Sequence, residues 1–199
     1  MTTPPAPPSS RNTAQFALHG LYSLIATPLF CGVMFGVFCP LILVTPTLPL
    51  RRALGRFSVH VCLALIGQRV RHVGFDHLPD GPCVVVANHC SYIDGLILTA
   101  RLPGRFTFVV QDGVARWPFV GWVLARMGVA YINRESARAG ARQTRGLLKR
   151  LQDGTSLAIF AEGTFDDAMP GVLPFKSGAF LLAARAKVPV VPVAVVKQI

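Results

Sequence analysis

A histidine and an aspartate five residues apart are the strongest candidates for chemistry in this sequence. His89 follows the apolar, β-branched run 83–87, and Asp94 lies where a helical pattern begins. On one regular helix five residues turn through roughly 500°, so the two side chains would point about 140° apart. They can meet only across a bend between a strand and a helix. There the carboxylate would orient the imidazole and stabilise its protonated form, which makes His89 a candidate general base.

Two other interpretations of these residues remain open. Ser91, followed three residues later by Asp94, fits a helix-capping pattern, so local structure alone can explain the aspartate. Cys90 beside His89 resembles a nucleophile paired with a base, but adjacent residues at a strand end usually point apart. The five cysteines form neither a Cys-x-x-Cys pair nor a zinc-ligand pattern, so we expect free thiols and no metal site.

The composition indicates one domain of ordinary size with anionic partners. The 199 residues carry a formal net charge of +11, with 20 basic and nine acidic residues, which favours a phospholipid surface, a phosphorylated ligand or nucleic acid. However, 52% of the residues are hydrophobic, and the basic residues are not interleaved with aromatic residues that could stack on bases. We therefore expect a phospholipid membrane as partner and no nucleic acid.

The first 66 residues divide into a tail and a helical segment. Residues 1–12 are rich in proline and serine and predict a disordered tail. Residues 12–50 contain no Asp, Glu, Lys or Arg, and the apolar core 21–44 is long enough to span a bilayer. The sparsely polar residues 53–66 indicate an interfacial or packed helix. We therefore expect a membrane-associated helical segment over 13–66.

Prolines and arginines bear on how this segment meets the membrane. Pro28 and Pro40 interrupt the hydrogen bonding of a helix, so a helix that enters and leaves on the same side remains open beside a spanning one. Arg51, Arg52 and Arg56 follow the apolar run directly. The positive-inside rule then predicts an inner-membrane protein with its remaining residues on the cytoplasmic face.

From residue 67 onward, strand-like and helix-like runs alternate. Strands are expected at 69–74, 83–88, 106–111, 129–133, 156–161 and 190–196, and helices at 92–101, 116–127, 137–152 and 178–187. The alternation predicts an α/β fold, a mixed sheet flanked by helices, over 67–199. The helix at 137–152 carries five basic residues at helical spacing, which would strengthen binding to an anionic bilayer; they are Arg138, Arg142, Arg145, Lys149 and Arg150.

Four motifs in a fixed order give a family resemblance. They are Asn88-His89-x4-Asp94, 128–134 (Gly-Val-Ala-Tyr-Ile-Asn-Arg), 160–164 (Phe-Ala-Glu-Gly-Thr) and 188–192 (Val-Pro-Val-Val-Pro). Together they resemble the glycerolipid acyltransferase family typified by 1-acylglycerol-3-phosphate acyltransferase (PlsC-type), over roughly residues 70–196.

The resemblance implies a membrane-bound enzyme of phospholipid biosynthesis. It would transfer a fatty acyl group from acyl-CoA or acyl carrier protein to the free hydroxyl of 1-acylglycerol-3-phosphate, without a bound cofactor. His89 would be the general base, oriented by Asp94. A lyso-ornithine lipid or another lysophospholipid is the alternative acceptor, and a non-catalytic lipid-binding protein is the alternative of another class.

The resemblance also implies a set of substrate-binding residues: Asn88, Arg134, Glu162, Gly163, Thr164 and Lys176. Two positions of the third motif depart from the family pattern, because this chain has Ala161 and Phe165 where many members have Pro and Arg. Losing that arginine removes a partner for phosphate. Lys176 lies in a Pro-Phe-x-x-Gly-Ala-Phe stretch found in a variant of the family, and we expect it to supply the missing charge.

Overall fold

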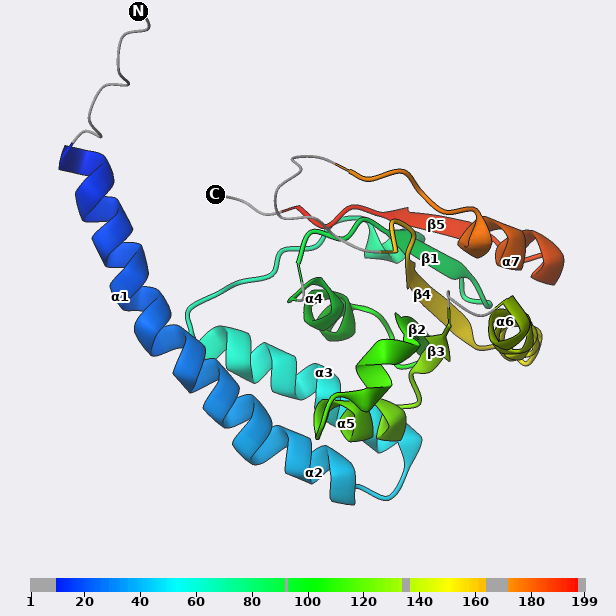
Figure 1. Ribbon diagram of the computed structural model, residues 1–199, viewed down its shortest axis with the longest axis horizontal. Coiled ribbons are helices and arrows are strands. Elements are labelled where there is room, and N and C mark those ends of the chain that lie inside the picture. The colour runs from blue at the N-terminus through cyan, green and yellow to red at the C-terminus, as the bar shows by residue number, and fades with distance from the viewer. Residues whose placement is uncertain (1–9, 92, 134–136, 164–171, 197–199) are drawn as a thin grey trace, which may run out of the picture.

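The computed structural model describes residues 10–91, 93–133, 137–163 and 172–196. In this part of the chain, an N-terminal pair of helices leads into a five-stranded sheet with helices on both faces (Figure 1). The strands are β1 (Val84–Ala87), β2 (Phe106–Gln111), β3 (Ala130–Ile132), β4 (Ser156–Phe160) and β5 (Val190–Val193). The α-helices are α1 (Ser10–Val33), α2 (Cys39–Val44), α3 (Leu48–Leu65), α4 (Ile93–Arg101), α5 (Val120–Arg126), α6 (Ala137–Gln152) and α7 (Gly178–Ala186). The π-helix η1 (Met34–Phe38) and the 3-10 helices η2 (Phe75–His77) and η3 (Asp112–Arg116) complete the described elements.

The sheet has the strand order β3-β2-β4-β1-β5, and all its ladders are parallel. The α/β fold is as expected from the sequence, but the expectation of a mixed sheet was wrong. The physical reason lies in the connections: α4, α5, α6 and α7 each separate two consecutive strands, and a connection containing a helix returns the chain in its original direction. All the strands therefore end at the same edge of the sheet.

The strand expected at 69–74 was also wrong. These residues form irregular structure between α3 and η2, and Val73 is 95% exposed. Gly74 adopts a φ of 75°, which turns the chain into η2. Only Val70 and Val73 are apolar in this run, and Val73 is exposed, so the run offers no continuous apolar face to pack on a sheet.

The two faces of the sheet enter different cores. Val84 and Val86 pack in the core that α6 and α7 cover, whereas Cys83, Val85 and Ala87 pack in the core that α4 covers. Successive side chains of a strand point to opposite faces. The pair α6 and α7 therefore lies on one face, and α4 lies on the other, together with the N-terminal helices (Figure 1).

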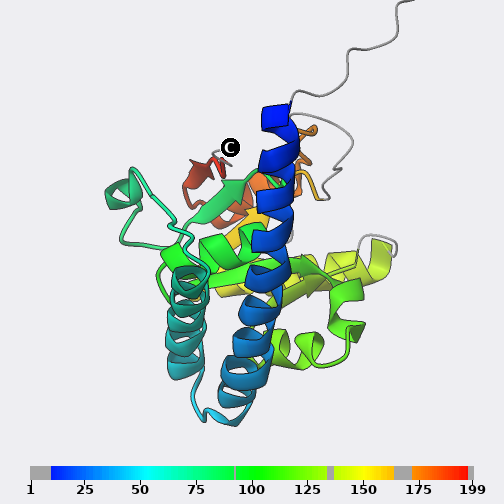
Figure 2. The ribbon, with the colours of Figure 1, turned by 90° about the vertical axis from the view of Figure 1, so that its left-hand side faces the viewer.

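The N-terminal helices form an antiparallel hairpin (Figures 1 and 2). The chain runs without a break from α1 through η1 into α2, and Leu18–Val44 is an apolar helical stretch of 27 residues, long enough to cross a bilayer. Its second half is not free: Met34, Phe38 and Ile42 pack against Val59 and other residues of α3. The same core includes residues of α4 and α5, so the hairpin shares a core with the domain that contains the sheet.

Both prolines are accommodated inside this helix. The helix continues through Pro28, and η1, with its wider turn, directly precedes α2, whose second residue is Pro40. A π-helical turn changes the hydrogen-bond register where a proline lacks its N–H. The prolines therefore do not end the apolar helix.

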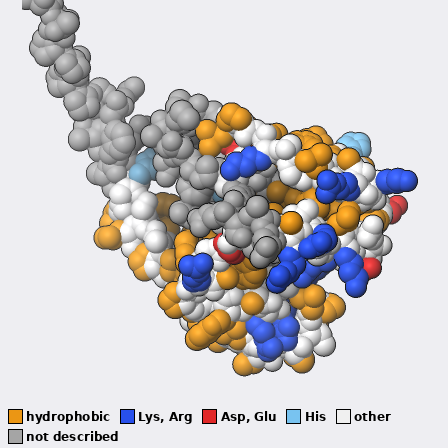
Figure 3. Space-filling view, turned by 45° about the vertical axis from the view of Figure 1, so that its right-hand side comes forward, with side chains coloured by type: hydrophobic (Ala, Val, Ile, Leu, Met, Phe, Trp, Pro, Cys, Tyr) orange, Lys and Arg blue, Asp and Glu red, His pale blue; other side chains and the backbone are white. Residues whose placement is uncertain are grey.

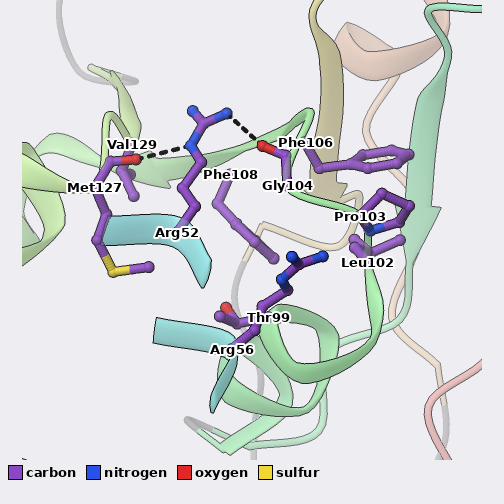
Figure 4. A pocket seen from close by; sticks show the side chains of 10 residues that line it. All are labelled: Arg52, Arg56, Thr99, Leu102, Pro103, Gly104, Phe106, Phe108, Met127 and Val129. Carbon is purple, nitrogen blue, oxygen red and sulfur yellow. Dashed lines mark hydrogen bonds between the residues drawn. The ribbon is translucent and has the colours of Figure 1, made fainter. Parts of the chain in front are cut away.

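Several arginines serve the fold by binding main-chain carbonyls. Arg51 donates to the carbonyls of Thr45 and Pro46 at 2.7 and 2.8 Å, just beyond the end of α2. Arg52 donates to Gly104 O at 2.9 Å and Met127 O at 3.1 Å, and thereby ties α3 to the two segments that lead into β2 and β3 (Figure 4). Burial, and then the charge of Arg150, lower the pKa of the Arg52 guanidinium from its ordinary value.

A substitution in α5 tests the close packing of this helix against η3. A Cβ atom added at Gly121 would lie 2.2 Å from the main-chain oxygen of Ala115, whereas one added at Gly146 in α6 would meet nothing within 4 Å. We expect Gly121→Ala to destabilise the protein by about 1–3 kcal/mol, and Gly146→Ala to stabilise it by about 0.4–1 kcal/mol. Thermal unfolding of both variants in the same detergent measures the difference. Equal melting temperatures would show that α5 can move away from η3 at no cost.

Candidate active site

The end of β1 and the start of α4 bring His89 and Asp94 together across a bend. His89 Nδ1 lies 3.1 Å from Asp94 Oδ2, and the side chains are 19% and 1% exposed. A carboxylate can only accept, so Nδ1 carries the proton and donates it to Asp94. The tautomer places the basic lone pair on Nε2, the arrangement that a general base needs.

The Asp94 carboxylate is held by the turn itself. Its Oδ2 also accepts the main-chain N–H groups of Cys90 at 2.6 Å and Ser91 at 2.7 Å, and its Oδ1 accepts the Ser91 hydroxyl at 3.0 Å. Burial raises the pKa of this carboxyl, but the hydrogen bonds from Cys90, Ser91 and His89 outweigh it, so the pKa of Asp94 lies below its ordinary value. The capping interpretation and the base-orienting interpretation therefore describe one arrangement, in which Asp94 closes the turn and also fixes His89.

Glu162 fixes the main chain of His89 from the neighbouring strand. It follows β4 and is 3% exposed. Its Oε1 accepts the main-chain N–H of His89 at 2.8 Å, and its Oε2 accepts the N–H of Leu173 at 2.7 Å. Both oxygens are thus engaged with main-chain donors, so Glu162 positions the histidine and the segment that leads to α7.

Phe160 is a site residue that the sequence did not single out. Its ring stacks on the His89 imidazole, with centroids 4.1 Å apart and an interplanar angle of 16°. The register that pairs Ala87 with Phe160 puts the two rings on the same face of the sheet. A flat aromatic face against the ring restrains the orientation of the imidazole. The signal was the place of Phe160 as the first residue of the third motif.

Asn88 binds the chain beyond β5. Its Oδ1 accepts the N–H of Val195 at 2.7 Å, and its Nδ2 donates to the Val195 carbonyl at 2.9 Å and to Cys90 Sγ. The side-chain amide thus extends the pairing between β1 and β5 by one position. Asn88 therefore joins the carboxyl end of β1, next to His89, to the segment that follows β5.

The remaining substrate-binding candidates lie at the same edge or outside the described residues. Gly163 has a φ of 77°, a conformation that favours glycine, directly after Glu162. Lys176 donates its main-chain N–H to Ala161 O at 2.9 Å and exposes its side chain to solvent. Arg134 and Thr164 lie outside the described residues.

The hollow drawn in Figure 4 is not part of this site. Its lining includes Arg56, Gly104, Phe106 and Val129. Gly104 precedes β2, and Val129 precedes β3. The hollow therefore lies at the amino ends of the strands, whereas His89 and Glu162 follow their carboxyl ends, where parallel sheets bind ligands.

The depressed pKa of Asp94 predicts a pH-dependent contribution to stability. A carboxyl whose folded-state pKa is lowered stabilises the fold above its unfolded-state pKa, and the contribution is lost as the pH falls through the folded-state value. We expect Asp94→Asn to lower the free energy of unfolding by about 1.5–3 kcal/mol at neutral pH, because the new amide N–H2 would face the N–H groups of Cys90 and Ser91. The gap between wild type and variant should shrink at a pH below the ordinary value of 3.8.

Urea unfolding in detergent at neutral pH and below pH 3.8 measures this gap, with Asp153→Asn, at an exposed residue just beyond α6, as the matched control. The control should unfold like the wild type at both pH values. A gap for Asp94→Asn that stayed constant into acid would show that the ionised carboxylate is not what holds the turn.

Comparisons with known proteins are consistent with this geometry. The acyltransferase family model matches residues 69–196. The lyso-ornithine lipid O-acyltransferase of Rhodobacter capsulatus is 34% identical over 182 residues, which cover 89% of this chain and 62% of that protein. The 1-acyl-sn-glycerol-3-phosphate acyltransferase of Saccharomyces cerevisiae is 35% identical over 143 residues, which cover 70% of this chain and 47% of that protein. The chain thus spans less than two thirds of the length of either relative.

A solved structure has the same fold. The 1-acyl-sn-glycerophosphate acyltransferase PlsC of Thermotoga maritima aligns with a TM-score of 0.63 and 22% identity over 90% of this chain and 73% of that one. The family model covers more than half of the chain and includes both His89 and Asp94. This chain therefore belongs to the acyltransferase family.

Proposed function

We propose that the chain is a membrane-bound O-acyltransferase that moves a fatty acyl group from a thioester donor to the free hydroxyl of a lysophospholipid. The observation that carries the proposal is the His89–Asp94 pair: a buried carboxylate fixes Nδ1, and Nε2 is the basic nitrogen. No protein nucleophile is needed, because the acceptor brings its own hydroxyl.

In the proposed reaction, His89 Nε2 takes the proton of the acceptor hydroxyl as its oxygen attacks the thioester carbonyl. The tetrahedral intermediate collapses, the C–S bond breaks, and the imidazolium returns the proton to the leaving thiolate. The products are an ester and a free thiol, so atoms and charge balance without a cofactor. Asp94 stabilises the imidazolium that forms during the attack, and Phe160 restrains its orientation.

The acceptor that we propose is 1-acylglycerol-3-phosphate, with acyl-CoA or acyl carrier protein as donor. Several relatives carry this acceptor in their names, including those of Saccharomyces cerevisiae and Brassica napus. A lyso-ornithine lipid is the second candidate. It is supported by the Rhodobacter capsulatus relative, which aligns with 89% of this chain, and by Phe165, which stands where many members have an arginine.

We propose that the hairpin attaches the protein to the inner membrane, and the arginines that follow the apolar run support the cytoplasmic side. Met34, Phe38 and Ile42 are buried against the rest of the protein, whereas Leu21, Leu24 and other side chains of α1 are exposed. Part of α1 also packs against the domain, because Ala26 is 7% exposed and Phe30 and Val33 contact the core that includes α3. We propose that the exposed apolar face of this helix contacts the acyl chains of the bilayer.

The catalytic pair is tested with purified full-length protein in detergent, acyl-CoA and 1-acylglycerol-3-phosphate, with the product read by mass spectrometry. We expect His89→Ala to lower kcat by about 10²–10⁴, the usual contribution of a general base. Asp94→Ala should lose slightly less. His60→Ala, an exposed histidine of α3, is the matched control and should keep full activity. A His89→Ala protein with wild-type turnover would exclude this mechanism.

The acceptor is tested by replacing the proposed phosphate ligands. We expect Arg134→Ala to raise the KM for 1-acylglycerol-3-phosphate roughly 10- to 150-fold, the loss of a charge-assisted contact of about 1.5–3 kcal/mol. Lys176→Ala should do the same more mildly, since lysine lacks the two-pronged geometry of arginine. Steady-state kinetics with each substrate varied independently, and with a lyso-ornithine lipid as second acceptor, measure the effect. If only the donor KM rose, these residues would bind the donor instead.

A further inference from the structure

The helix α6 presents a basic stripe that the proposed reaction does not use. Arg142, Arg145 and Lys149 are exposed and follow at intervals of three and four residues. At 100° per residue they fall within about 60° of one another. Leu147 and Leu151, on the opposite side of the helix, are buried in the core. The stripe therefore points directly away from the sheet.

No carboxylate of the described residues neutralises the stripe. Neither α6 nor α7 contains an Asp or Glu. Among the residues that the structure describes, no carboxylate forms an ion pair with the three side chains. Arg150 differs, because it donates to Gly128 O and so serves the fold. In Figure 3 blue side chains gather on the side of the molecule that carries α6 and α7.

The bilayer is not the partner that this stripe fits. The sequence suggested a basic face beside an anionic membrane, but α6 and α7 cover one face of the sheet, and the apolar hairpin packs with α4 and α5 on the other side (Figure 1). A hairpin inserted in a leaflet therefore leaves the stripe facing the aqueous phase. Its partner must be soluble and acidic.

The stripe begins near the catalytic edge of the sheet. Gln143, next to Arg142, accepts the main-chain N–H of Asn133, the residue that follows β3. β3 and β1 are separated by two strands in the sheet, so their axes lie about 14 Å apart at the usual spacing of strands. A soluble partner docked on the stripe would therefore lie beside His89 without covering it, and could deliver a group on a flexible arm.

We propose that Arg142, Arg145 and Lys149 form the docking surface for an acyl carrier protein, bound through an acidic face. This inference rests on the proposed function, since the carrier delivers the thioester that the His89 site consumes. Association between opposite charges speeds encounter and is screened by salt. The stripe should therefore favour a carrier-bound thioester over acyl-CoA at low ionic strength.

The test is a charge reversal, Arg142→Glu/Arg145→Glu/Lys149→Glu, with Arg69→Glu/Arg71→Glu/Arg116→Glu as the control. The control changes the net charge equally at exposed residues outside α6 and α7. With palmitoyl-loaded acyl carrier protein we expect kcat/KM of the α6 variant to fall at least about tenfold at low salt. With palmitoyl-CoA its rate should stay unchanged. The control should keep wild-type kinetics with both donors.

Other outcomes overturn the inference. An unchanged rate with the loaded carrier, equal losses with both donors, or a wild type that uses only palmitoyl-CoA would exclude docking on α6. Loss of binding to anionic phosphatidylglycerol vesicles without a change in donor kinetics would assign the stripe to the bilayer. Titration of the carrier onto the His89→Ala protein reports docking without turnover, so a failure of the proposed reaction is distinguished from a failure to dock.

Discussion

The site is organised by the need to hydrogen-bond one buried carboxylate, that of Asp94, which is paired with a histidine and main-chain N–H groups. Asp94 is 1% exposed, and burying a charge is costly unless hydrogen bonds replace its water. The donors come from the three consecutive residues His89, Cys90 and Ser91. The turn can therefore satisfy Asp94 only in one conformation, with β1 ending at residue 87 and α4 beginning at Ile93. The orientation of the imidazole follows from that requirement.

The same edge of the sheet is joined by side chains as well as by strand pairing. Glu162 links the end of β4 to the main chain of His89, and Asn88 links the end of β1 to Val195 beyond β5. Three neighbouring strands are thus fixed to one another where their regular hydrogen bonding stops. A general base gains from such rigidity, because a displacement of its nitrogen by a fraction of an ångström weakens proton transfer.

The sequence predicted the features that depend on local pattern. The strands that begin at 84, 106, 130, 156 and 190, the helix at 137–152, and the strand–helix bend at His89 all follow from apolar runs and their spacing. It missed the parallel sheet, because strand direction depends on how the connections cross it. It missed the stack of Phe160 on His89, which depends on register between strands far apart in the chain. The family resemblance had implied that Glu162 and Asn88 bind substrate; this role stays a prediction, and in the structure their side chains bind main-chain groups.

The net charge of +11 has at least two physical origins. Some arginines donate hydrogen bonds to main-chain carbonyls at helix ends and in loops, and so stabilise the fold; they include Arg51, Arg52 and Arg126. Within the described part of the chain, Arg142, Arg145 and Lys149 have no such carbonyl partners, and they lie on the face of the sheet opposite the apolar hairpin. A lipid acceptor that arrives from the hairpin side and a carrier that docks on α6 would approach His89 from opposite faces. The parallel sheet makes this arrangement feasible, because both approaches end at the carboxyl edge where His89 lies.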